Sequence, residues 1–168
     1  MKKALVLMAL ILLLCLAACG WEQQEGMPNP WHDISETEVA DLCPASFVVP
    51  EGAENASWSV MEAEDAAPLV QLNFDLNGNS FTAREQATED AAADISGMYY
   101  EWTAESEDAL QNWGLPCRSY RHIGDDGYAD LCAWYDEASG TAYSLSVTAE
   151  DLDGFDLLAV AEALSPTE

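Results

Sequence analysis

The chain has 168 residues, 49% of them hydrophobic, and it carries 31 aspartates and glutamates against only five lysines and arginines. Its formal net charge is −26 at pH 7. Because phosphate groups are bound by clustered lysines and arginines, this composition excludes nucleic acid as a partner and excludes electrostatic adsorption to anionic lipid headgroups.

The first residues have the features of a bacterial signal peptide. Two lysines precede an apolar run that ends near Leu16 and is too short to span a bilayer permanently. Ala17-Ala18 then stands before Cys19, which resembles the lipobox of bacterial lipoproteins, whereas leucines stand before Cys15. We therefore expect residues 1–18 to be cleaved and Cys19 to be acylated, with an ordinary secretory signal as the alternative. The two acyl chains would hold the protein at the extracytoplasmic face of the cell membrane.

Cleavage at that point would leave an acidic domain on a short tether. Both lysines are removed, so three arginines remain against 31 acidic residues, a formal charge of −28. We interpret this charge as a solubility device, and attraction to cations or to a basic partner is the alternative. Residues 19–33 are polar, contain two prolines, and are expected to form a flexible tether that spans about 20 Å. Residues 34–168 are expected to fold as one domain.

The first half of that domain contains a helix signal and a hairpin signal. Ser35 and Glu38 form a capping-box pattern that predicts a helix beginning at residue 36, and a strand is expected at 57–63. Apolar and polar residues then alternate on both sides of Asn77-Gly78, a sequence suited to a type I′ turn. A two-residue loop here sets Phe74 opposite Phe81.

The second half of the domain predicts more strands and a C-terminal helix. Residues 104–116 are ambiguous. The other expected elements are a short helix at 88–97, a strand at 98–103, a hairpin at 117–135, a strand at 140–148 and an amphipathic helix at 153–164. The sum is an α+β fold, in which six or seven hairpin-linked strands form an antiparallel sheet and the N- and C-terminal helices pack on one face.

Three cysteines remain for a disulfide if Cys19 is acylated. With the turn of the second hairpin centred on Asp125-Asp126, Cys117 and Cys132 lie on one face as diagonal neighbours. An extracytoplasmic location permits disulfides, so we predict a bond between these two cysteines. Pairing of Cys43 with either of them is the alternative.

Motifs of the common catalytic and metal sites are missing from the sequence. The chain after residue 18 has no lysine for Schiff-base chemistry, and its histidines and cysteines lack the spacing of a zinc site. The stretch from Asp75 to Gln86 begins like a calcium loop but lacks the glycine and glutamate that such a loop requires. We therefore expect neither a metal nor a cofactor. A pairing of His122 with a cysteine, or of two carboxylates, keeps an enzyme as the alternative.

Aromatic residues are frequent in the middle of the chain and suggest a ligand site. We select Tyr99, Trp102 and Trp113 as candidate ligand-binding residues, and packing in the core is the alternative for each.

Four short motifs resemble a known group of proteins: NPW at 29–31, ISGMYYEW at 95–102, YADLCAWYD at 128–136 and DLDGFD at 151–156. They are similar to small lipoproteins of Gram-positive, chiefly clostridial, bacteria. These form a domain family of unknown function that is also similar to extracytoplasmic segments of some anti-sigma factors. The resemblance covers nearly all of the chain after residue 18 and implies no catalytic residues. We expect a monomeric, membrane-anchored binding or sensing module with a cationic, cell-wall or protein partner; the alternative is a cell-envelope hydrolase.

Overall fold

One antiparallel sheet dominates the structure. The computed structural model describes residues 29–43, 46–125, 127–150 and 155–166. In this part of the chain eight strands form the sheet, in the order β1-β2-β3-β4-β8-β7-β6-β5. The elements are β1 (Trp31–Ile34), α2 (Glu36–Leu42), β2 (Glu54–Ala63), β3 (Ala66–Leu76), β4 (Asn79–Ala87), β5 (Ala104–Leu110), β6 (Leu115–Gly124), β7 (Gly127–Asp136), β8 (Thr141–Ala149) and α3 (Leu157–Ala163).

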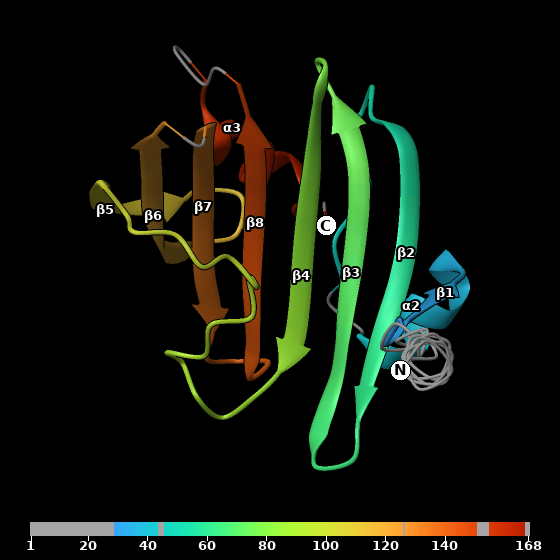
Figure 1. Ribbon diagram of the computed structural model, residues 1–168. Helices are drawn as coiled ribbons and strands as arrows, with labels where there is room; N and C mark the ends of the chain where they lie inside the picture. Colours follow the sequence, from blue (N-terminus) through green and yellow to red (C-terminus); the bar gives the residue numbers. More distant parts are fainter. Residues whose placement is uncertain (1–28, 44–45, 126, 151–154, 167–168) are drawn as a thin grey trace, which may run out of the picture.

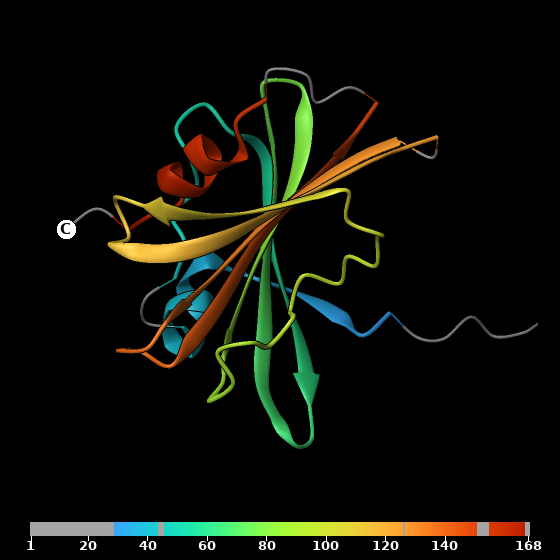
Figure 2. The same cartoon turned by 90° about the vertical axis from the view of Figure 1, so that its left-hand side faces the viewer.

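The sheet consists of two meanders of four strands each (Figure 1). The chain runs through β1 to β4, crosses to the far edge at β5, and returns through β6 and β7 to place β8 beside β4. Figure 2 shows α2 and α3 on one side of the twisted sheet and the β4–β5 connection on the other. The two faces are named the helix face and the connection face below. The predicted antiparallel sheet with two helices on one face is therefore present.

The β3–β4 hairpin has the predicted register. Phe74 pairs with Phe81 and Leu72 with Ala83, and the two phenylalanine rings stack with centroids 5.1 Å apart. Asn77-Gly78 has φ angles of 53° and 83°, as a type I′ turn requires.

The core lies between the sheet and its two helices. Ser35 and Glu38 form the predicted capping box at the start of α2, and this helix buries Val39. The C-terminal helix buries Leu157, Val160 and Ala161. Each fully buried leucine or phenylalanine contributes about 1.5–3 kcal/mol, so these contacts hold the helices on the sheet. The largest fully buried side chains beneath them are Tyr143, Phe74, Phe81, Leu72, Leu110 and Leu145.

The strand count and one segment differ from the predictions. The domain is mainly β with eight strands, because β1 forms at the end of the predicted tether and β5 forms in the ambiguous region. Both are edge strands, and β5 is exposed over most of its length, so neither shows the alternation of a half-buried strand. Residues 88–97 form turns and bends rather than a helix, and residues 98–103 form no strand.

The long β4–β5 connection is shaped by contacts with the sheet. The Arg84 guanidinium on β4 donates to the carbonyl oxygens of Ile95 and Ser96, at 3.2 and 2.7 Å. It also lies 5.2 Å from the centre of the Trp31 ring. Gly97 follows with φ of +67°, where an added Cβ would meet the Arg84 side chain. These contacts replace the local hydrogen bonds that the predicted helix would need.

The predicted cleavage site, the lipid site at Cys19 and most of the tether lie outside the described residues. Among the described residues, neither α2 nor α3 is long and apolar enough to cross a membrane.

Candidate functional site

A pocket of about 390 Å³ lies on the helix face at the β5 edge of the sheet, beside the start of α3. We call it the α3 pocket. Its volume falls in the range of small-molecule sites, about 300–1,000 Å³. Three strands and the α3 region line it, with polar residues on the strands and mostly apolar residues near the helix. The residues on which the argument depends are Ser106, Asp108, Ser119, Arg121, Asp130, Phe155, Asp156, Leu157 and Leu158.

An ion pair between Arg121 and Asp130 forms part of the pocket lining. The two residues face each other on β6 and β7. Nε of the guanidinium lies 2.7 Å from one carboxylate oxygen and Nη2 lies 2.5 Å from the other. Asp130 is only 4% exposed. This two-point contact fixes the arginine and cancels its charge inside the pocket.

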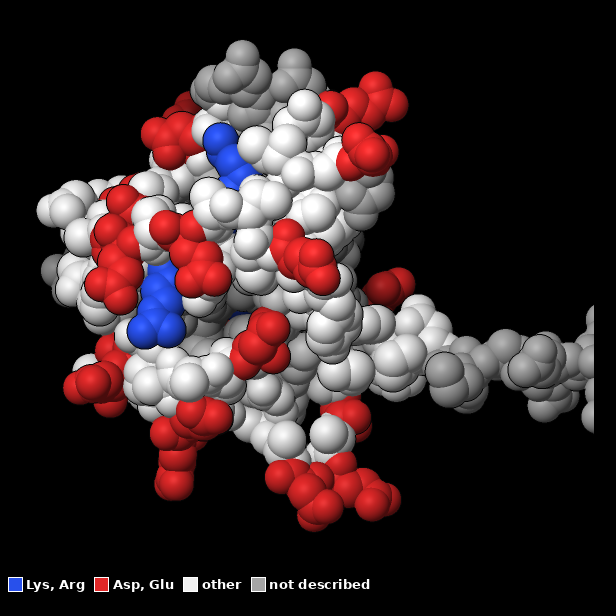
Figure 3. All heavy atoms as spheres, turned by 60° about the vertical axis from the view of Figure 1, so that its left-hand side comes forward, with Lys and Arg blue, Asp and Glu red and all other residues white. Residues whose placement is uncertain are grey.

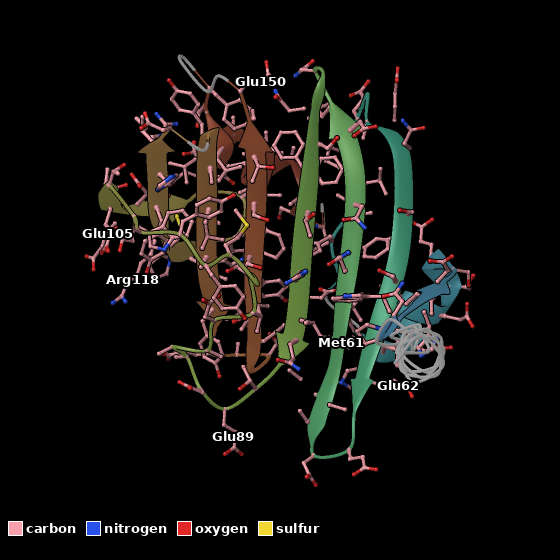
Figure 4. The ribbon with its side chains drawn as sticks, in the orientation of Figure 1. Met61, Glu62, Glu89, Glu105, Arg118 and Glu150 are labelled. Carbon is pink, nitrogen blue, oxygen red and sulfur yellow. The ribbon has the colours of Figure 1, made fainter. Side chains whose placement is uncertain are left out.

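Three other carboxylates line the pocket, and Asp108 and Asp156 are the two that lie on its strand β5 and at the start of α3 on the helix face; the third, Glu105, projects outward at the edge of the sheet (Figure 4). Asp108 accepts a hydrogen bond of 2.7 Å from Ser106, and Asp156 accepts one of 3.2 Å from the backbone N–H of Ala159. Neither forms an ion pair with an arginine among the described residues. The Ser119 hydroxyl oxygen is buried and interacts with the thiols of Cys117 and Cys132. The described lining of the pocket therefore has a net negative charge, and its carboxylates have oxygens that can accept further hydrogen bonds.

Acidic side chains also outnumber basic ones on the surface around the β5 edge of the molecule. Figure 3 shows many red side chains and only small blue areas on the face that it presents. At the β5–β6 edge, Glu105 and Arg118 project outward (Figure 4). Arg118 lies 4.0 Å from Glu107, and both side chains are largely exposed. Because an exposed ion pair is weak and neutralises only one carboxylate, the surface at this edge keeps its excess of negative charge.

Four aromatic rings form a row on the connection face. The contacts run from His122 to Tyr100, from Tyr100 to Trp102 and from Trp102 to Tyr120, with centroid distances of 4.8, 5.8 and 5.6 Å. We call this row the aromatic strip. All four side chains are half-buried, and Nδ1 of His122 lies 2.8 Å from the carbonyl oxygen of Glu101. The strip thus fastens the β4–β5 connection to β6.

The structure separates the three predicted ligand-binding residues. Trp102 is part of the aromatic strip, and Tyr99 is nearby in sequence and 93% exposed. Trp113 packs instead with the core of the helix face, where its ring contacts Trp134 at 5.3 Å. Its indole N–H donates to the carbonyl oxygen of Ala161 in α3, at 2.9 Å. Packing therefore explains Trp113, and the three residues do not form one site.

The sequence patterns missed the residues of the α3 pocket. They come from three strands and from the start of a helix, separated in sequence by up to about fifty positions. One signal was available in β6 and β7. Arg121 lies four residues after Cys117 and Asp130 lies two residues before Cys132, so both charged residues share the face of the buried cysteines, and charged residues on a buried face usually have a partner.

Cys117 and Cys132 are adjacent free thiols in the structure, so the predicted disulfide is not formed there. The predicted register is correct, since Cys117 pairs with Trp134 and Cys132 with Ser119. A hydrogen bond between the two thiols lowers the pKa of Cys117 and raises that of Cys132. The third cysteine, Cys43, interacts with the carboxyl group of Glu85.

Glu85 is a fully buried carboxyl group in the middle of the sheet. It is 0% exposed and lies on β4 between Val70 and Tyr143 of the neighbouring strands. One oxygen accepts a hydrogen bond of 2.5 Å from Ser46; the other has no well-formed hydrogen bond among the described residues, and the Cys43 thiol interacts with the carboxyl group. Burial raises the pKa of Glu85 to about 7, and burial also raises the pKa of Cys43 to about 12.

The cysteine–histidine alternative has no geometric support on β6 and β7. His122 contacts the aromatic strip on the connection face, whereas Cys117 and Cys132 are part of the core on the helix face. Among the described residues there is also no group of three or more histidine, cysteine or acidic side chains that could hold a metal ion.

No family model, curated protein or solved structure matches this chain. The resemblance to clostridial-type lipoproteins therefore rests on the short motifs alone, and an assignment of function depends on the geometry of the chain itself.

Proposed function

We propose that this protein is a membrane-anchored extracytoplasmic lipoprotein that binds a small molecule in the α3 pocket. The observation that carries the proposal is the composition of this pocket. The apolar residues Phe155, Leu157 and Leu158 line it together with polar groups on three strands. Small-molecule sites typically combine a mainly apolar lining with a few converging polar groups.

The location in this proposal is supported by the N-terminal sequence. Ala17-Ala18 before Cys19 satisfies the small-residue requirement of lipoprotein processing. The first strand begins at Trp31, so roughly a dozen residues separate the acylated cysteine from the folded domain. A flexible tether of this length spans about 20 Å, which would keep the pocket near the membrane surface.

Binding is favoured over hydrolysis by the chemistry of the pocket. Its arginine is held by Asp130, and its buried hydroxyl, Ser119, has no histidine among the lining residues to act as a base. The remaining carboxyl groups of the lining are Asp108, Asp156 and the outward-projecting Glu105. Turnover of an envelope glycan that is lost in Asp108→Asn would therefore favour the hydrolase alternative.

The test is a ligand-observed NMR screen of small organic fragments against the full-length lipoprotein in non-ionic detergent. Ser106→Trp places a large ring on the exposed edge strand at the pocket. Glu107→Trp places the same ring on the next residue, whose side chain points to the connection face. We expect fragments that bind the native protein and Glu107→Trp to lose binding in Ser106→Trp. Equal binding to both variants would contradict a site in the α3 pocket.

A further inference from the structure

We infer that the α3 pocket selects small organic cations, in which an ammonium group is attached to an apolar body. This inference rests on the proposed function and specifies the ligand class of the same site.

The charge of the pocket is the first argument. Arg121 is engaged at two points by Asp130, so this pair contributes no net charge toward a ligand. Asp108 and Asp156 then remain as carboxylates without an arginine partner among the described residues. A cation in the pocket would be attracted by both carboxylates, and the acidic surface around it would speed its approach.

The hydrogen-bonding groups also suit a donor-rich ligand. Each of these carboxylates has one oxygen in a described hydrogen bond, to Ser106 or to the backbone of Ala159, which leaves the other oxygen as an acceptor. An ammonium group has three N–H donors and no acceptor, so it matches this set.

The opposite wall of the pocket requires an apolar body on the ligand. Phe155, Leu157 and Leu158 line that side. The Phe155 ring stacks on Phe81 with centroids 5.8 Å apart, so it is held in position. A bare metal ion would leave this wall without a partner, and calcium requires six to eight oxygen ligands, which the described residues do not bring together.

An anionic ligand fits the pocket poorly. Its carboxylate would have to displace Asp130 from Arg121, which would leave a 4% exposed carboxylate without its ion-pair partner. It would also approach Asp108 and Asp156 against like charge. The pocket therefore discriminates by charge as well as by shape.

The experiment compares three probes of similar size: 2-phenylethylamine, 2-phenylethanol and 3-phenylpropionate. Binding to the full-length lipoprotein in non-ionic detergent is measured by calorimetry, and its position is found from backbone amide chemical shifts. We expect the amine to bind at least tenfold more tightly than the alcohol or the acid, with shifts at the pocket. Asp108→Asn should weaken amine binding about tenfold, whereas Glu107→Gln, one residue away on the other face, should leave it unchanged.

The outcomes separate the ligand class from the proposed function. Binding of the alcohol or the acid in the pocket as tightly as the amine would overturn the cation selectivity and leave the small-molecule site intact. Equal weakening by Asp108→Asn and Glu107→Gln would show that general surface charge, not the pocket, attracts the amine, and would also overturn the inference. If none of the three probes shifts pocket resonances, the inference fails, and a negative fragment screen would then show that the proposed function fails too.

Discussion

Replacing Glu85 by glutamine should make the stability of the domain less sensitive to pH. The carboxyl group is fully buried on β4, and one of its oxygens has no well-formed hydrogen bond among the described residues. Burial raises its pKa from the ordinary value of 4.5 to about 7. Between these two values the folded protein holds a proton that the unfolded chain releases. The free energy of unfolding therefore falls as the pH rises through this window and levels off above pH 7.

The size of this effect follows from the two pKa values. One pKa unit corresponds to about 1.4 kcal/mol, so the interval from 4.5 to about 7 corresponds to roughly 3 kcal/mol. Glutamine has nearly the same shape and stays neutral at every pH, so it removes this contribution. The substitution also lowers the free energy of unfolding by the same amount at every pH, because a buried amide N–H without a partner costs about 1–3 kcal/mol. The diagnostic quantity is therefore the change in the free energy of unfolding between pH 5 and pH 8.

The assay is urea denaturation at several pH values, with Glu62→Gln as the control. Glu62 is an exposed glutamate on β2 that points away from the core (Figure 4). We expect Glu85→Gln to gain up to about 3 kcal/mol relative to the native protein between pH 5 and pH 8. The control should follow the native protein. If Glu85→Gln follows it as well, the buried carboxyl does not titrate in this window and the reasoning is refuted.

Four further predictions concern the anchor, the cysteines, the connection and the surface charge. Cys19→Ala should abolish fatty-acid labelling and membrane retention while Cys15→Ala keeps both, and the reverse pattern would contradict the lipid site. Under oxidising conditions Cys117 and Cys132 should form a disulfide worth about 3 kcal/mol for a loop of this length, and a peptide map that pairs Cys43 instead would contradict this. Gly97→Ala should destabilise the domain by at least about 1–2 kcal/mol, because it strains a positive φ and displaces Arg84 from Trp31; unchanged urea denaturation and Trp31 fluorescence would argue against that contact. Sodium chloride should raise the thermal midpoint modestly and calcium at equal ionic strength should add little, since no metal-binding cluster occurs among the described residues; a midpoint that ignores sodium but rises steeply with calcium would reveal a specific site.

The elements that could be predicted from sequence are those whose signals are local. In the β3–β4 hairpin, alternation and Asn77-Gly78 both specify one register, and Phe74 does face Phe81. The capping box at Ser35 and the spacing of Leu157, Val160 and Ala161 likewise specify helix start and buried face without reference to the rest of the chain.

The elements that could not be predicted depend on distant partners. The local pattern of residues 88–97 favours a helix. However, the Arg84 guanidinium donates hydrogen bonds to the carbonyl oxygens of Ile95 and Ser96 and holds the segment against the connection face. The edge strand β5 follows from pairing with β6, because its own residues are mostly exposed and polar. The conformation of both segments is therefore determined by tertiary contacts.

The candidate site shows the same limit. Aromatic content pointed to Trp102 and Trp113, which the sheet places on opposite faces. The α3 pocket depends instead on the pairing of Arg121 with Asp130 across two strands and on the position of α3 above them. Neither relation is visible before the strand order is known.

A titration that follows the backbone amide resonances tests the central claim most directly. The full-length lipoprotein is titrated with 2-phenylethylamine and with the fragments that bind in the screen. Binding in the α3 pocket predicts the largest shifts at Ser119, Arg121 and Asp130, and their loss in Ser106→Trp. Shifts that centre instead on Tyr100, Trp102 and His122, and persist in Ser106→Trp, would place recognition on the aromatic strip and contradict the account.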